Sequence, residues 1–432
     1  MPTIAVHTLG CKVNQYDTQA MLELFQAAGY AEVPLSAEAD VYLINTCTVT
    51  GTGDRKSLQL ARRLRREHPA SRLILCGCMA QHQSEKLLET GADLVLGTQR
   101  RLEVVSLLAQ VISSGRPLCA VAPLGASTVF EPLCISGQSG HTRAVLKIQE
   151  GCDHFCTYCI IPSVRGPVRS RPPEDLRKEA LRLRDAGFRE LVLTGIHLSS
   201  YGKDLLPRLA LLDAVQTVSE IPGILRIRLG SLEPGIATEA FASQLSRLPG
   251  VCPQFHLALQ SGSDTVLARM KRRYNTRQYL AGVENLRRYF PHAAFTTDIL
   301  TGFPGETETE FQETARFIEK VGFSRIHVFP YSPRPDTPAA AMADQIPAAL
   351  REARARQLIR LGKTVAEKDL LSRVGQETEL LPEEKVKGCW EGYTPEYIRV
   401  RLPESSVCQS GCPVRIRLAS ADGSLMTGIP LS

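Results

Sequence analysis

Short apolar runs alternate with helical segments along most of the chain, and this alternation constrains the fold more than any other feature. Four runs near the N-terminus predict strands: "TIAVHT" (3–8), "DVYLINT" (40–46), "RLILCG" (72–77) and "DLVLG" (93–97). Between the first two, "YDTQAMLELFQAAGY" carries an apolar stripe with helical spacing that ends at Gly29. Because strand–helix alternation favours a parallel sheet covered by helices, residues 1–115 are predicted to form an open parallel α/β domain.

The alternation stops over residues 116–142, which are rich in Gly, Ser and Pro and are predicted to be a linker. It then restarts, with strands predicted at 143–149, 190–195, 225–230, 254–260, 294–300 and 324–330. Six βα units predict a partial (β/α)₆ barrel over residues 143–371, which ends in a basic, Ala-rich helix from about 346 to 371. In parallel barrels the chemistry lies at the C-terminal ends of the strands.

The last segment, residues 372–432, has a different pattern. "TELLPEE", "YIRVRLP" and "PVRIRLAS" are short alternating strands separated by Gly and Pro, and they predict a small β-barrel. Overall the chain is therefore predicted to be an α/β protein with an added β-barrel. Its 43% apolar and 22% charged residues are typical of a globular protein. The sequence shows neither an apolar run of about 20 residues nor a signal-peptide pattern. We therefore expect a cytoplasmic location and no membrane partner.

Three cysteines lie close together in "GCDHFCTYCIIP" (151–162), with the spacing C-x₃-C-x₂-C: Cys152, Cys156 and Cys159. The chain has 13 cysteines, an odd number, so a complete disulfide framework is excluded, and cysteine clusters in a reducing compartment favour metal binding. A closed zinc site needs four ligands, and His154 would be the fourth in that alternative. Three thiolates on a four-iron cluster instead leave one iron open to a substrate.

Three further cysteines follow predicted strands: Cys11 the first, Cys47 the second and Cys78 the third. Ligands of open parallel sheets bind beyond the carboxyl ends of the strands, and neighbouring strands lie only about 5 Å apart. These three thiols are therefore predicted to converge on a second cluster. The alternative is three unrelated buried thiols.

The C-x₃-C-x-aromatic-C motif after the first barrel strand resembles that of the radical S-adenosylmethionine enzymes. The whole chain is similar to one subfamily, the methylthiotransferases, in stretches that include "TLGCKVNQYDTQAM", "NTCTVT", "GCMAQ", "LTGIHLSSYG", "HLALQSGSDTVLARMKRRY" and "TDILTGFPGET". The resemblance implies two 4Fe-4S clusters, one held by Cys152, Cys156 and Cys159 and an auxiliary one held by Cys11, Cys47 and Cys78. It also implies S-adenosyl-L-methionine as cofactor and a TRAM-like C-terminal barrel.

The resemblance implies the replacement of a C–H bond by C–SCH₃. In this family the barrel cluster cleaves S-adenosylmethionine to a radical that removes a hydrogen atom, and the second cluster carries the sulfur. "GCKVN" and "CTYCIIP" look most like the type that modifies C2 of N6-threonylcarbamoyladenosine at tRNA position 37. Alternatives are an isopentenyladenosine tRNA or a ribosomal protein as substrate. A non-catalytic, metal-stabilised RNA-binding protein is the alternative from another class.

Contacts to S-adenosylmethionine are expected from residues outside the cysteines. The resemblance places Tyr158 against the adenine, and strand ends put Thr194, Gly195, Ser231, Gln260 and Asp298 near the site. Each of these strand-end residues has an ordinary turn or strand end as its alternative. "GFPGE" (302–306) lacks the phosphate-loop pattern and is interpreted as a tight loop.

The formal charge of +6 is concentrated in "RRLRRE" (62–67), "RMKRR" (269–273) and "REARARQLIRLGK" (351–363). Such segments suit a polyanion, and a solvated helix face is the alternative. With the resemblance, the expected partners are the anticodon loop of a tRNA and an electron-donor protein such as flavodoxin or ferredoxin.

"LCGCMAQ" contains two cysteines, and only one of them is expected to be a ligand of the second cluster. Cys76 belongs to the apolar run of the third strand, whereas Cys78 follows Gly77, where the backbone can turn. We expect Cys76→Ala to keep full iron content and Cys78→Ala to lose the second cluster. Iron and sulfide assays on the two reconstituted variants check this, and the reverse pattern would place the strand end two residues earlier.

Overall fold

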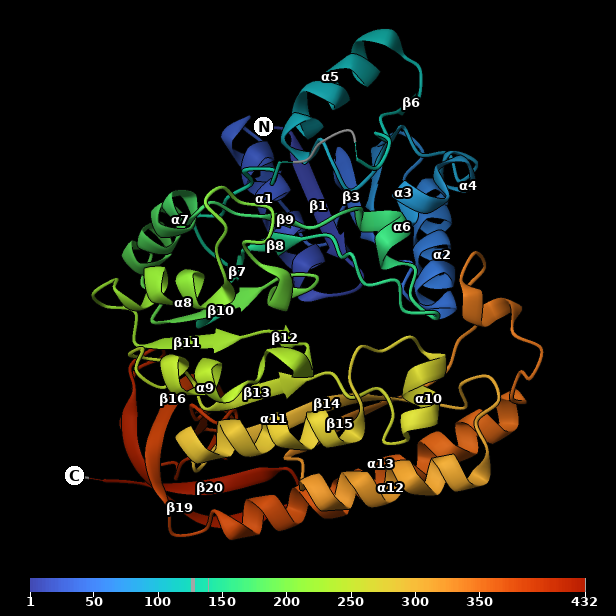
Figure 1. Cartoon of the computed structure of the whole chain (residues 1–432). Helices are drawn as coiled ribbons and strands as arrows, with labels where there is room; N and C mark the ends of the chain where they lie inside the picture. Colours follow the sequence, from blue (N-terminus) through green and yellow to red (C-terminus); the bar gives the residue numbers. More distant parts are fainter. Residues whose placement is uncertain (126–128, 139, 432) are drawn as a thin grey trace.

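The computed structural model describes residues 1–125, 129–138 and 140–431, and these form an α/β part, a partial barrel and a small β-barrel (Figure 1). The N-terminal sheet is parallel, with the strand order β2-β1-β3-β4-β5-β6. Its strands are β1 (Thr3–Thr8), β2 (Ala31–Glu32), β3 (Val41–Thr46), β4 (Arg72–Gly77), β5 (Leu94–Leu96) and β6 (Leu118–Cys119). The four strands expected from the apolar runs are all present.

Helices cover both faces of this sheet, so each face has its own apolar core. One core takes side chains from α1 (Lys12–Ala27) and α5 (Val104–Ser114), the other from α2 (Gly51–Glu67), α3 (Cys78–His82) and α4 (Ser84–Leu88). β3 lies in the middle of the sheet and all six of its residues are buried. This two-sided burial explains why the strands read as continuous apolar runs.

The barrel consists of two parallel sheets, β11-β10-β7 and β12-β13-β14-β15; each of the six predicted runs overlaps one of these strands, and β12 is a short additional strand just after the run 225–230. The strands are β7 (Arg143–Lys147), β10 (Glu190–Thr194), β11 (Arg226–Leu229), β12 (Ser231–Leu232), β13 (Gln254–Leu257), β14 (Ala294–Thr301) and β15 (Arg325–Pro330). Outer helices pack on them: α7 (Pro173–Asp185), α8 (Leu211–Ser219), α9 (Glu239–Leu245), α11 (Thr276–Tyr289), α12 (Glu308–Val321) and α13 (Ala348–Ser372).

Shorter elements lie in the loops of the barrel and, for the turn Arg101–Glu103, between β5 and α5 of the N-terminal part. They are the ribbon of β8 (Gln149–Glu150) and β9 (Arg169–Ser170), the helices α6 (Ile161–Arg165) and α10 (Asp264–Arg269), and four 3₁₀ turns at Arg101–Glu103, Leu198–Ser200, Pro234–Ile236 and Pro338–Ala341. α6 packs against α3 of the N-terminal part, so the segment after the three-cysteine motif touches the segment that begins at Cys78.

The segment expected to be a linker packs against the parts that it joins. Its residues 118–119 form β6 and extend the N-terminal sheet. Leu133 and Ile135 are buried in the barrel core, and the Ile135 backbone N–H donates to the Glu179 carboxylate at 2.9 Å. Among the described residues of the segment the one helix or strand is the short β6, and low periodicity could not show that these residues are packed.

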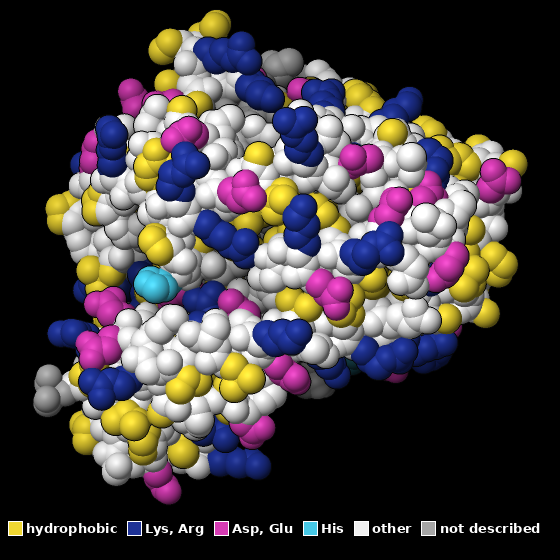
Figure 2. Space-filling model, turned by 60° about the horizontal axis from the view of Figure 1, so that its bottom comes forward, with side chains coloured by type: hydrophobic (Ala, Val, Ile, Leu, Met, Phe, Trp, Pro, Cys, Tyr) yellow, Lys and Arg dark blue, Asp and Glu magenta, His cyan; other side chains and the backbone are white. Residues whose placement is uncertain are grey.

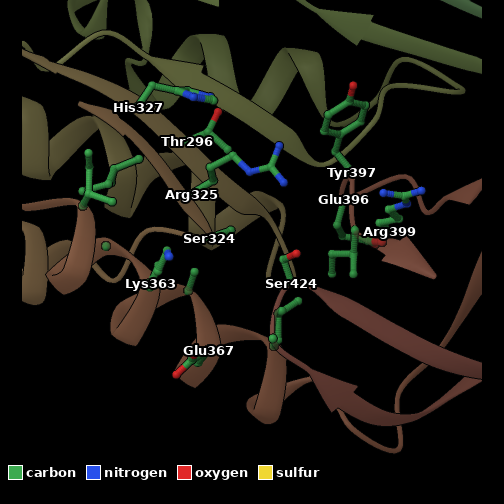
Figure 3. Close-up of a pocket in the computed structure, with 17 residues that line it drawn as sticks. Thr296, Ser324, Arg325, His327, Lys363, Glu367, Glu396, Tyr397, Arg399 and Ser424 are labelled. Atoms are coloured by element: carbon green, nitrogen blue, oxygen red, sulfur yellow. The ribbon is translucent and has the colours of Figure 1, made fainter. Parts of the chain in front are cut away.

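The C-terminal strands close into a barrel in the order β16-β17-β18-β20-β19, as the alternating pattern predicted. They are β16 (Glu377–Val386), β17 (Cys389–Tyr393), β18 (Arg399–Arg401), β19 (Val414–Asp422) and β20 (Leu425–Pro430). Tyr397 reaches the large barrel, where the Arg143 and Arg228 guanidinium groups lie 4.9 and 4.7 Å from its ring centroid. A pocket of about 650 Å³ between β15, α13 and this small barrel contains Arg325, Lys363 and Arg399 on its wall (Figure 3).

The surface carries both signs of charge. On the face shown in Figure 2, Lys and Arg side chains are interspersed with Asp and Glu instead of forming one large basic patch. Among the described residues, no helix is long and apolar enough to cross a membrane.

Gly77 allows the chain to turn from β4 into Cys78. Its φ is +95°, and a Cβ there would lie 2.2 Å from Asn45 Oδ1 and 2.6 Å from the Thr46 carbonyl oxygen. Gly29 has a similar φ of +88° but nothing within 4 Å of a Cβ, so it is a matched control.

We expect Gly29→Ala to lower the free energy of unfolding by about 1–2 kcal/mol through backbone strain. Gly77→Ala should cost about 1–3 kcal/mol more because of the steric overlap. Denaturant titration of both variants measures the difference. If both variants lose the same free energy of unfolding, the close approach at Gly77 does not contribute to stability.

Candidate metal centres and active site

Cys152, Cys156 and Cys159, here called the barrel trio, lie in the loop between β8 and α6, above the barrel strands. The Cys159 backbone N–H donates to the Cys156 carbonyl at 3.0 Å, so the loop is tightly turned. Burial, together with a smaller contribution from neighbouring thiols of the trio, raises the pKa of Cys152 to about 11 and that of Cys159 to about 12. Thiols placed this way ionise readily only when a metal centre takes up the charge.

Cys11, Cys47 and Cys78, here called the strand-end trio, come together at the carboxyl edge of the N-terminal sheet. Cys11 precedes α1, Cys47 follows β3, and Cys78 begins α3. Burial raises the pKa of Cys78 to about 11; the Arg165 guanidinium opposes this, and the proximity of Cys11 and Cys47 adds to it. The three cysteines are thus neighbours despite their separation in sequence.

Cys76 lies elsewhere. It is inside β4, packs in the N-terminal core, and its thiol donates to the Ile44 carbonyl at 3.6 Å.

The spacing of the thiols distinguishes the kinds of metal that fit. A zinc ion holds sulfur ligands at about 2.3 Å, which puts the sulfur atoms within roughly 4 Å of one another. Among the described residues, the group whose ligand atoms all lie within 4.8 Å is His154, His197 and Glu233, and neither cysteine trio is this compact. The wider spacing suits a polynuclear iron–sulfur cluster, and His154 faces His197 and Glu233 instead of completing a zinc knuckle.

A polar recess adjoins the barrel trio. Arg272 donates to Cys156 Sγ at 3.2 Å and to Glu233 Oε2 at 2.7 Å. The His154 and His197 rings pack at a tilt of 39° with 4.2 Å between their centroids, and the Nε2 atom of His197 is 3.7 Å from Glu233. Burial, together with His197, lowers the pKa of His154 to about 4, so its imidazole is neutral at pH 7. A guanidinium beside a carboxylate offers complementary charges to the amino and carboxylate groups of S-adenosylmethionine.

Arg272 corrects an expectation from the sequence. The basic segment 269–273 was interpreted as an RNA-binding surface, but the Arg272 side chain is only 7% exposed and bonded within the recess. Arg269 donates to both oxygens of Glu310 at 2.8 Å, and Arg354 from the second basic segment pairs with Glu306 at 2.8 Å. Arg272 and Arg354 are therefore buried and paired in the interior, whereas Arg269 is paired but 33% exposed.

The residues predicted to contact S-adenosylmethionine lie at different depths. Tyr158 packs edge-on against Phe303 with 6.5 Å between ring centroids. Thr194 ends β10, Gly195 follows it, and Ser231 begins β12, so these three are at strand ends. At Gly195 a Cβ would lie 2.8 Å from Gln149, which leaves room for glycine only.

Gln260 and Asp298 are coupled through the backbone, because the Gln260 N–H donates to the Asp298 carbonyl at 2.9 Å. Gln260 has a φ of +67°, which is uncommon for a residue other than glycine. Asp298 lies within β14 instead of at its end, and its carboxylate is 3.3 Å from His256 Nε2. Its role as a cofactor contact stays a prediction, as do those of the other five residues.

A buried ionic network joins the two parts that hold the trios. Arg165 of α6 donates to Cys78 Sγ at 3.1 Å, to Glu150 at 2.6 Å, to Asp17 at 3.2 Å and to Asn14. Arg101 and Lys147 pair with the same two carboxylates. The side chains of all these ionised groups are at most 4% exposed.

Sequence reasoning missed both Arg165 and Arg272. Arg165 stands six residues after the last cysteine of the motif, and Arg272 stands in a basic run; neither position reveals a thiol partner. The signal that was available is the location of Cys78 after a strand and of Cys156 in a three-cysteine loop, because a buried thiolate needs a neighbouring positive charge.

The fold and the two cysteine trios define a radical S-adenosylmethionine enzyme with two candidate cluster sites. The model of the Radical SAM superfamily matches residues 146–318, and that of the uncharacterized protein family UPF0004 matches residues 3–97. The solved cobalamin-binding methyltransferase TsrM from Kitasatospora setae covers 78% of this chain and 74% of its own with a TM-score of 0.60, at 14% identity, which shows a shared fold only.

Full-length relatives place the chain more narrowly. It is 42% identical to the threonylcarbamoyladenosine tRNA methylthiotransferase MtaB of Bacillus subtilis, over 93% of this chain and 90% of the relative. It is 35% identical to the protein of the same name from Thermotoga maritima, over 98% and 96%. A tRNA-2-methylthio-N(6)-dimethylallyladenosine synthase of Moorella thermoacetica is 36% identical over 88% and 87%. The chain belongs to the radical S-adenosylmethionine methylthiotransferase family.

Arg272 and its neighbour Arg273 make a matched pair for testing the recess. Replacing Arg272 by Met leaves Glu233 buried without its closest cation, so the protein should be less stable by about 3 kcal/mol and retain less iron in the barrel trio. Arg273→Met, at an exposed position, should change stability by less than about 0.5 kcal/mol and leave iron unchanged. Thermal unfolding and iron content measure both effects. Equal stability and equal iron content of the two variants would show that Arg272 does not support the recess.

Proposed function

We propose that this protein inserts a methylthio group at C2 of N6-threonylcarbamoyladenosine at position 37 of tRNA. The observation that carries the proposal is the pair of cysteine trios, in a chain that matches threonylcarbamoyladenosine tRNA methylthiotransferases over almost its full length. A single base in an anticodon loop is accessible to such a site, because loop bases can be splayed out of the stack.

The proteins named as dimethylallyladenosine synthases are also similar, so the isopentenyladenosine tRNA is the second candidate substrate.

In this proposal each part of the chain has a distinct task. The barrel trio and the strand-end trio each hold one 4Fe-4S cluster, and together with S-adenosylmethionine these supply hydrogen abstraction, sulfur and methyl chemistry. Arg272 and Glu233 bind the charged amino-acid end of the cofactor beside Cys156. Arg165 places a positive charge against Cys78. The packed N-terminal part covers the barrel opening and limits the access of water to the reacting atoms.

The proposal includes partners and a location. Reduction of the barrel cluster requires a one-electron donor, for which a flavodoxin or ferredoxin is the candidate class. Both that partner and the tRNA substrate are cytoplasmic, so the protein is expected to act there.

Two experiments test the proposal. The gene should restore the 2-methylthio derivative of N6-threonylcarbamoyladenosine in tRNA of a Bacillus subtilis strain that lacks its 42%-identical relative, as measured by nucleoside mass spectrometry. Replacing the barrel trio by Ala should abolish reductive cleavage of S-adenosylmethionine and remove about half of the iron. Replacing the strand-end trio should spare cleavage and lose sulfur insertion.

Failure to restore this nucleoside, together with formation of the isopentenyl derivative, would assign the second substrate. Modification of a ribosomal protein instead would exclude tRNA as the target. A colourless, zinc-containing preparation would support the non-catalytic alternative.

A further inference from the structure

A cavity of about 430 Å³ lies where the three parts of the chain meet. Its wall includes α1 and β1 of the N-terminal part, Val145, Val192 and Arg228 of the barrel strands, and Tyr397 of the small barrel. The volume is within the range of cavities that hold small ligands. Lys12, which lines this cavity, directly follows Cys11, so the backbone connects the cavity wall to one cysteine of the strand-end trio.

Among the Lys, Arg, Asp and Glu side chains of the cavity wall, cations outnumber anions. The wall carries Lys12, Arg143 and Arg228, against a single carboxylate, that of Glu32. Arg228 is already engaged, because its Nε atom donates to Glu190 at 2.7 Å. Arg143 is engaged too: its Nε atom is 2.7 Å from a carboxylate oxygen of Glu383, and its guanidinium packs on Tyr397.

Lys12 differs from the two arginines. Within the described part of the chain it has no hydrogen bond or ion pair, and its side chain is exposed to the cavity. Glu32 lies on β2, the edge strand of the N-terminal sheet, and makes no ion pair with it. The cavity therefore holds an unpaired ammonium group beside two guanidinium groups that are already paired with carboxylates, and the free positive charge of Lys12 favours an anionic ligand.

We propose that Lys12 binds the carboxylate of the threonylcarbamoyl group and thereby selects this substrate over adenosines with an uncharged N6 substituent. The inference rests on the proposed function and specifies how the substrate is recognised. C2 and C6 lie on either side of N1 in the same six-membered ring, and C6 carries the exocyclic N6, so a base whose C2 faces the strand-end trio can place its N6 substituent in the cavity that Lys12 lines. A neutral apolar substituent would leave Lys12 without an anion, and such unmatched polar groups are the strongest source of discrimination.

A phosphate of the tRNA backbone offers the same charge as the carboxylate, and the experiment must separate the two sources. Phosphate contacts strengthen binding of any RNA to a similar degree, whereas the carboxylate is present only in the modified base. We therefore compare two anticodon stem-loop RNAs that differ in one group. One carries N6-threonylcarbamoyladenosine, and the other carries the same nucleoside as its methyl ester.

The measurement is the Kd of each RNA for the reconstituted enzyme with S-adenosylmethionine. The wild-type protein should bind the free acid about 10- to 100-fold more tightly than the ester, which is the usual weight of a charge-assisted contact. Lys12→Met should bind both RNAs with the affinity that the wild type has for the ester, and Lys12→Arg should keep part of the preference. Iron content and uncoupled cleavage of S-adenosylmethionine should stay unchanged in Lys12→Met, which verifies that the adjacent Cys11 still holds its cluster.

Lys56→Met is the matched control, because Lys56 is an exposed lysine of α2 that is absent from the cavity wall. It should leave the ratio of the two Kd values unchanged. Equal binding of acid and ester by the wild type overturns the inference without any variant. A Lys12→Met protein that weakens both RNAs equally also overturns it and assigns Lys12 to a phosphate.

The proposed function fails separately from this inference. If the wild-type enzyme does not methylthiolate the threonylcarbamoyl RNA at all, the proposed function is wrong. If it does so without distinguishing acid from ester, only the role of Lys12 is wrong.

Discussion

The arrangement of the two cysteine trios depends on one buried side chain, that of Arg165. Its guanidinium contacts a thiol and an amide of the N-terminal part and a carboxylate of the barrel part within a single hydrogen-bonded group. A buried ion pair contributes little net stability, but removal of one partner costs about 3–5 kcal/mol because the other charge is left unpaired. The network therefore adds little to the strength of the association between the two parts. Its main effect is to fix their relative position.

Both trios follow the same electrostatic design. Arg165 donates to Cys78 in one trio, and Arg272 donates to Cys156 in the other. Thiolate-held clusters bring negative charge into a region of low dielectric, and a fixed guanidinium offsets part of the cost. Arginine suits this position better than lysine, because its planar group reaches a sulfur and a carboxylate at the same time, as Arg272 does with Glu233.

Much of the fold was predictable because its signals are local. Each apolar run from Thr3–Thr8 to Arg325–Pro330 contains the information for one strand, and Cys11, Cys47 and Cys78 could be placed at one sheet edge from strand order alone. The side chains around the thiols could not be predicted in this way. Arg165 and Asn14 are 151 residues apart, and no periodicity links the two positions. In the basic segment 269–273, composition does not show that Arg272 is turned inward while Lys271 and Arg273 are exposed.

The small C-terminal barrel also has a role that its sequence conceals. Tyr397 closes the far side of the cavity, and it is held there by Arg143 and Arg228 of the large barrel. The same two arginines are neutralised by Glu383 and Glu190, so they shape the cavity without supplying a free charge. Lys12 alone among the three cations of the wall keeps its charge available to a ligand. Arg143 and Arg228 therefore build the wall of the cavity, whereas Lys12 is the group that is free to bind a ligand. In the proposed role, Lys12 alone would set the charge of the accepted substrate, and the cluster sites would not need to change.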